Sequence, residues 1–163
     1  MEGFSFIPRS WYNDVMHKQD IIPYTAGIID GEGYISLVPY SHCKTYNPVV
    51  KITSTDKVLT DFLLKNFGGY VHKRTFKNNL WKNAYCWEQR NKKLVKKFLS
   101  LFKDYLLIKR EQAELVIEYC DIPIQKVHPR YKSFDPKAQE RLHEIYKNLR
   151  HLNKRGKPPA ETK

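Results

Sequence analysis

The sequence has few cysteines and no long apolar run, and both absences narrow the class of protein. Cys43, Cys86 and Cys120 are its three cysteines. They form no C-x-x-C pair, and no histidines follow at zinc-finger spacing, so we expect reduced thiols and no structural zinc. The chain also lacks an apolar run of about 20 residues and a basic-then-apolar signal pattern. We therefore expect an intracellular protein that is neither secreted nor bound to a membrane.

Acidic residues are scarce as well. The 163 residues include 29 Lys and Arg against 17 Asp and Glu, a formal charge of +12, while 41% are hydrophobic. Such a chain can bury a core, so it is a folded protein whose surface favours a polyanion. We expect an N-terminal extension over residues 1–19, one domain over residues 20–152 and a basic, disordered tail over residues 153–163.

Hydrophobic periodicity predicts helix, hairpin, helix, hairpin and then three helices. Asp20 is expected to cap the first helix through its carboxylate, and Thr55 or Asp56 to cap the second. Between Pro123 and Pro129 we expect an irregular connection. The helices are predicted at Ile21–Asp30, from Thr55 or Asp56 to Phe67, Leu94–Leu107, Lys109–Tyr119 and Lys137–Leu152, and the strands at Tyr34–Tyr40, Thr45–Thr53, Tyr70–Phe76 and Asn83–Gln89.

Two hairpins with intervening helices predict an α+β fold with an antiparallel curved sheet. Helices should cover one face, and the other should form a basic saddle that can lie in the major groove of a duplex. The residues expected on this DNA-facing side are Tyr34, Ser36, Val38, Tyr40, Thr45, Asn47, Val49, Lys51, Tyr70, His72, Arg74, Ala84 and Cys86.

The segment 25–33, TAGIIDGEG, combines small residues with two acids. Gly27 and Gly31 are four apart, with Ala26 beside them, so another helix can approach this face closely. The segment occurs once, so the natural partner is the same helix of a second copy, related by a two-fold axis. The predicted interface residues are Ala26, Gly27, Asp30 and Gly31.

Asp30 and Glu32 lie where Gly31 and Gly33 should end the helix, which lets one carboxylate point into the fold and the other outward. Two-fold symmetry would then bring two outward carboxylates together. Such a group of hard oxygen ligands suits Mg²⁺, and Mn²⁺ or Ca²⁺ can occupy the same kind of site.

The segment resembles the LAGLIDADG motif of homing endonucleases, with Thr25 in place of the first Leu and Glu32 in place of the second Asp. The order of the predicted elements over residues 20–152 and the segment 107–113, LIKREQA, extend the resemblance. It implies an intron-encoded, homodimeric, metal-dependent endonuclease that cuts both strands of a long, nearly palindromic DNA site. It further implies an archaeal cytoplasm or an organelle matrix, and no organic cofactor.

The resemblance also implies roles for individual residues. Glu32 would bind the metal with the Gly31 carbonyl beside it, while Asp30 would mainly hold the helix end. Lys109 would act near the scissile phosphate. The polar residue at the end of the second strand would be Ser54 or Thr53, and we choose Ser54.

Simpler explanations remain open for these residues. The two glycines can pack a helix within one subunit, and Ser54 can be a local cap. The alternative function is a non-cleaving nucleic-acid-binding protein of the same fold, such as an RNA maturase. Glu32 and Lys109 favour cleavage, because binding alone needs no carboxylate facing a phosphate.

Overall fold

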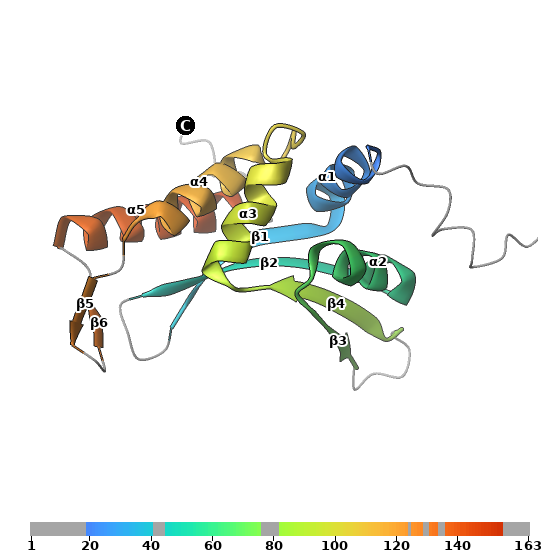
Figure 1. The fold of residues 1–163 in the computed structure, drawn as a ribbon, viewed down its shortest axis with the longest axis horizontal. Coiled ribbons are helices and arrows are strands. Elements are labelled where there is room, and N and C mark those ends of the chain that lie inside the picture. Colours follow the sequence, from blue (N-terminus) through green and yellow to red (C-terminus); the bar gives the residue numbers. More distant parts are fainter. Residues whose placement is uncertain are drawn as a thin grey trace, which may run out of the picture.

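The computed structural model describes residues 19–40, 45–75, 82–123, 125–128, 131–133 and 136–154. The predicted order of helices and hairpins is confirmed in them (Figure 1). The helices are α1 (Ile21–Glu32), α2 (Lys57–Phe67), α3 (Lys92–Phe102), α4 (Arg110–Asp121) and α5 (Pro136–Leu152), and the strands are β1 (Gly33–Pro39), β2 (Tyr46–Ser54), β3 (Tyr70–Arg74), β4 (Ala84–Gln89), β5 (Gln125–His128) and β6 (Tyr131–Ser133).

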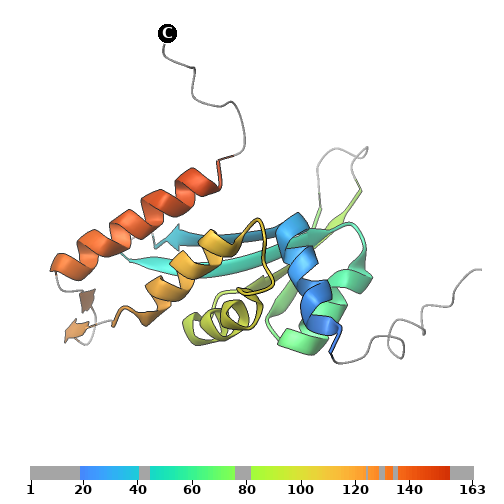
Figure 2. The same ribbon diagram turned by 90° about the horizontal axis from the view of Figure 1, so that it is seen from above.

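Strands β1 to β4 form one antiparallel sheet in the order β1-β2-β4-β3. The five helices lie on the same side of this sheet, and its other side carries no described helix (Figure 1). Viewed from the helical side, α1 lies beside α2 at one end of the helical layer, and α5 lies at the other end (Figure 2). The predicted α+β fold is therefore confirmed.

The core lies between the helical layer and the sheet. Trp87 of β4 is fully buried there, and its indole nitrogen donates to the Gly68 carbonyl at the end of α2 over 2.7 Å. Alternate residues of β1 and β2 supply the sheet side, as strand geometry requires. Other buried members of this core include Ile29, Ile35, Leu37, Val50, Ile52, Leu63, Phe98, Leu99, Phe102, Val116, Leu142, Ile145 and Leu149.

Three local predictions were wrong. Helix α3 ends at Phe102 rather than Leu107, and β5 and β6 form a short hairpin where an irregular connection was expected. Asp20 precedes α1, but its side chain makes no capping hydrogen bond, whereas Asp56 caps α2 by accepting from the Val58 amide. The apolar run beyond Phe102 misled the α3 prediction, because the chain leaves the helix there to meet α1.

Residues 1–18 of the expected N-terminal extension and most of the expected tail lie outside the described residues. The same is true of the turn between the predicted strands Tyr70–Phe76 and Asn83–Gln89. None of the described helices has the length and apolarity that crossing a membrane would require.

Candidate metal centre and nucleic-acid surface

Helix α1 passes directly into β1 at Gly33. The Gly33 amide hydrogen-bonds the Ile29 carbonyl, and a Cβ built at Gly33 would lie 2.4 Å from that oxygen. Any larger residue would push the backbone apart, so glycine is required here by close approach. Gly31, in contrast, lies within α1 and does not end the helix, which corrects the prediction.

Asp30 points into the fold and fastens the segment before α4. Its Oδ2 accepts from the Leu107 amide over 2.7 Å, and its Oδ1 accepts from the Lys109 amide over 2.9 Å. These bonds are made within one chain and tie the end of α1 to the segment before α4. The predicted contact of Asp30 with a partner helix remains a prediction.

Lys109 reaches the C-terminal end of α1 from the other direction. Its Nζ donates to the carbonyls of Ile29 over 2.8 Å and of Asp30 over 2.5 Å. The last carbonyls of a helix lack intrahelical partners and carry partial negative charge, so an ammonium group is favourable there. The structure thus brings Lys109 to the helix end that carries Glu32.

Glu32 is the last residue of α1 and is exposed. Its carboxylate makes no hydrogen bond or ion pair with another residue that the structure describes, so it is available to an external ligand. Gly31 lies in the same last turn, where carbonyl oxygens lack helical partners. A carboxylate and a nearby carbonyl are oxygen donors of the kind that Mg²⁺ accepts.

One face of α1 carries Gly27 and Gly31, both exposed. A Cβ built at either position meets no atom within 4 Å, so neither glycine is needed for packing inside this chain. Ala26 was predicted on this face, but it is 2% exposed and belongs to the chain's own core. A helix turns 100° per residue, which separates Ala26 from its neighbour Gly27.

Ser54 ends β2 close to the same place. Ile52, two residues earlier in β2, pairs with Gly33, the residue at which α1 passes into β1. The Ser54 hydroxyl accepts from the Asp56 amide over 3.0 Å, a local turn that leads into α2. Thr53, the other candidate, points to the other face of β2 from Ser54. It pairs with Cys86 of β4.

The residues predicted to contact nucleic acid lie on one face of the sheet. The pairs Tyr34 with Lys51, Ser36 with Val49 and His72 with Cys86 follow from the strand register. Four of the predicted contact residues nevertheless expose at most 6% of their surface. These buried members are Ser36, Val49, Ala84 and Cys86, which form the floor of the face.

Glu88 and Arg90 also lie on this face, although the sequence pattern was not used to predict them there. Glu88 is 2% exposed on its side chain, and its Oε1 lies 3.2 Å from Lys51 Nζ and also pairs with Arg90. Burial raises the pKa of Glu88, but hydrogen bonds from Arg90 and Lys51 outweigh it, so the pKa lies below its usual value. Strand alternation from Ala84 would have placed Glu88 here, so the signal was available.

Comparison with solved structures finds the same architecture in proteins of low sequence identity. The archaeal intron-encoded homing endonuclease I-Vdi141I, solved with DNA, matches 86% of this chain and 89% of its own at 17% identity, with a TM-score of 0.68. The homing endonuclease I-CvuI, solved with its target in the presence of Ca, matches 85% of each chain at 18% identity, with a TM-score of 0.66. The chain has the LAGLIDADG homing endonuclease fold.

The LAGLIDADG fold also occurs in I-GzeII, solved with its DNA target. There the match covers 81% of this chain but only 45% of that one, at 20% identity and a TM-score of 0.62. One copy of the fold thus accounts for less than half of that protein. No family model and no curated protein matches the sequence, so the resemblance drawn from segment 25–33 is confirmed through the fold.

Proposed function

We propose that the chain is a site-specific, metal-dependent DNA endonuclease of the intron-encoded homing type, acting as a homodimer on a long, nearly palindromic duplex. The observation that carries this proposal is the end of α1. There an available carboxylate, Glu32, the ammonium group of Lys109 and a helix face of open glycines occur together. The solved structures of similar fold are described as homing endonucleases bound to DNA, which supports the choice of substrate.

Gly27 and Gly31 support the proposed dimer. Glycine within a helix costs about 1 kcal/mol relative to alanine, and two such residues would cost about 2 kcal/mol. No contact inside the described chain requires either residue. A second copy of α1 at close range would explain both, because a glycine face lets helix backbones approach each other.

Glu32 and Gly31 support the proposed metal site. Two-fold symmetry about the glycine face would set one Glu32 from each protomer near the axis, with the Gly31 carbonyls beside them. These are hard oxygen donors, which suit Mg²⁺ and, in its place, Mn²⁺ or Ca²⁺. When bound, such an ion would supply positive charge to a phosphodiester and lower the pKa of an attacking water.

The chain's own residues would do the remaining work. Lys109, held at the end of α1, would offset the negative charge that develops on the scissile phosphate. Ser54 would help to order water there. The open side of the sheet would hold the duplex, with Lys51, His72 and Arg74 among the side chains facing the groove.

Selection from a randomised duplex pool tests the proposal. Full-length protein is incubated with the pool and Mg²⁺, and cleaved molecules are recovered and sequenced. We expect one long sequence motif with approximate two-fold symmetry, and no cleavage when the metal is chelated. Recovery of bound but uncut molecules, with Mg²⁺ and with Mn²⁺, would contradict cleavage and support the non-cleaving alternative.

A further inference from the structure

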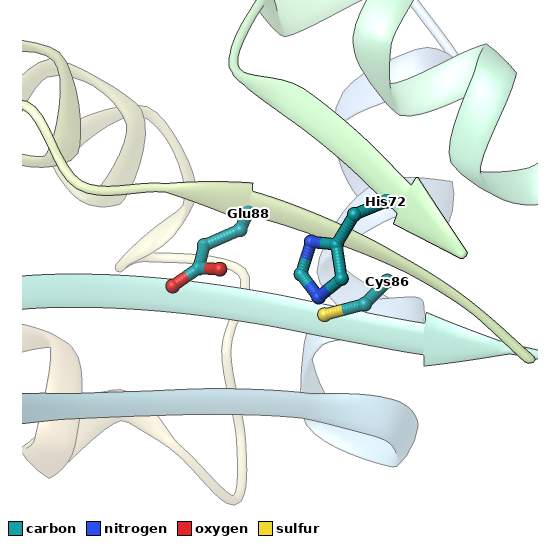
Figure 3. A group of neighbouring side chains, drawn as sticks. All are labelled: His72, Cys86 and Glu88. Atoms are coloured by element: carbon teal, nitrogen blue, oxygen red, sulfur yellow. The ribbon is translucent and has the colours of Figure 1, made fainter. Parts of the chain in front are cut away.

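Three side chains with metal-binding atoms meet on the open side of the sheet, on two strands that do not pair with β1. His72 comes from β3, and Cys86 and Glu88 come from β4 (Figure 3). Antiparallel pairing sets His72 directly across from Cys86, and Tyr70 across from Glu88. One ligand atom of each of the three residues lies within 4.8 Å of those of the other two.

The atoms are suited to a different ion from the one proposed at Glu32. A thiolate, an imidazole and one carboxylate oxygen are ligands that select Zn²⁺ or a similar ion over Mg²⁺. Zinc bonds of about 2.0–2.3 Å place neighbouring ligand atoms roughly 3.3–3.7 Å apart in a tetrahedral site. The ligand atoms therefore have to move closer together by up to about 1.5 Å. Rotation of the exposed His72 side chain can bring its imidazole toward the other two.

Cys86 and Glu88 are already fixed in place. Their residues are 3% and 2% exposed, and Lys51 and Arg90 keep the Glu88 carboxylate charged. Both ion pairs fall on Oε1, and a carboxylate has a second oxygen with which to bind a metal. The two cations oppose further positive charge, so we expect weaker binding than at a site of four thiolates.

We propose that His72, Cys86 and Glu88 bind one thiophilic divalent ion, such as Zn²⁺, with the fourth position open to water. On binding, the Cys86 thiol loses its proton to solvent and the sulfur bonds to the metal. The ion would pin β3, the last strand of the sheet order, to β4. Spacing along the sequence predicted no zinc site, because these ligands are brought together only by the pairing of strands.

Cobalt titration of the full chain tests the site. Co²⁺ is added to wild-type protein in a thiol-free reductant, without DNA, and the thiolate-to-cobalt charge-transfer band and the visible d–d bands are recorded. We expect saturation at one ion per chain, and displacement by Zn²⁺. Cys86→Ser should abolish the charge-transfer band, whereas Cys43→Ser and Cys120→Ser should retain it. Absence of the band in wild type, or its persistence in Cys86→Ser, would overturn the proposal.

His72→Gln provides a second variant, because this residue is exposed and its replacement should not disturb folding. Since even an outer partner of a metal ligand is worth about 10- to 100-fold in affinity, loss of the imidazole should weaken Co²⁺ binding by at least about tenfold. Zn²⁺ should raise the melting temperature of wild type and of Cys120→Ser, but not of His72→Gln. Equal affinity and equal stabilisation in wild type and His72→Gln would also refute the site.

Discussion

Gly27→Ala is expected to stabilise the folded chain and to weaken its dimer at the same time. The new methyl group would meet no atom within 4 Å in the single chain. Only the gain in helix propensity remains, about 1 kcal/mol in the free energy of unfolding. For a domain of this size, that gain corresponds to a rise of roughly 2–4 °C in the melting temperature.

In the dimer, the same substitution is expected to be unfavourable, because it weakens association. Forcing a methyl group into a close contact costs about 1–3 kcal/mol, and a two-fold interface would contain two such groups. The total of about 2–6 kcal/mol corresponds to a dissociation constant raised by about 30-fold or more, since 1.4 kcal/mol is tenfold. The same substitution thus separates folding from association.

Sedimentation velocity over a range of concentrations measures the dissociation constant, and thermal unfolding below that constant measures the single chain. Asn148→Ala is the matched control, because Asn148 is exposed on α5, whose place in the helical layer is at the other end from α1 (Figure 2). It should raise stability by a few tenths of a kcal/mol and leave the dimer unchanged. A monomeric wild type, or a Gly27→Ala dimer of undiminished affinity, would refute the shared-helix interface.

Three further substitutions test how the site is held. Gly33→Ala should lower the free energy of unfolding by about 2 kcal/mol in urea titrations, because its Cβ would meet the Ile29 carbonyl at 2.4 Å; an unchanged midpoint would contradict the close approach. Asp30→Ala should speed hydrogen exchange at the Leu107 and Lys109 amides, which lose their acceptor, and unaltered protection would contradict that role. Because the pKa of Glu88 is lowered on folding, its stabilising contribution is present above the carboxyl's ordinary value of 4.5 and is lost as the pH falls below it. Urea titrations at pH 7 and at pH 3 should therefore show a gap between wild type and Glu88→Gln that shrinks in acid, and a constant gap would exclude the ion pairs as its cause.

Much of the fold was predictable because its signals are local. Alternation along β1 and β2 assigned Ile35 and Leu37 to the core and Tyr34 and Lys51 to the open face, and the strand register confirmed it. Glycines after Phe67 and the cap before α2 marked that helix correctly. These features depend on neighbours two to four residues apart, which a sequence displays directly.

The errors came from contacts between distant segments. Asp30 accepts hydrogen bonds from the amides of Leu107 and Lys109, 77 and 79 residues further on. No local sequence pattern predicts this contact, and so the end of α3 just before it was placed wrongly. Ala26 was assigned to the interface by its size, although its direction depends on how α1 packs on the sheet. The meeting of His72 with Cys86 and Glu88 requires the register between β3 and β4, which spacing alone does not supply.

Glu32→Gln tests the role of Glu32 in cleavage most directly. The substitution removes the charge that would bind the metal while keeping the shape of the side chain and every basic contact to DNA. On a duplex selected by the wild type, with Mg²⁺ present, the variant should bind with an affinity within about threefold of wild type and show a cleavage rate reduced by at least about 100-fold, equivalent to 2.7 kcal/mol in the barrier. Cleavage at the wild-type rate would contradict the assignment of Glu32.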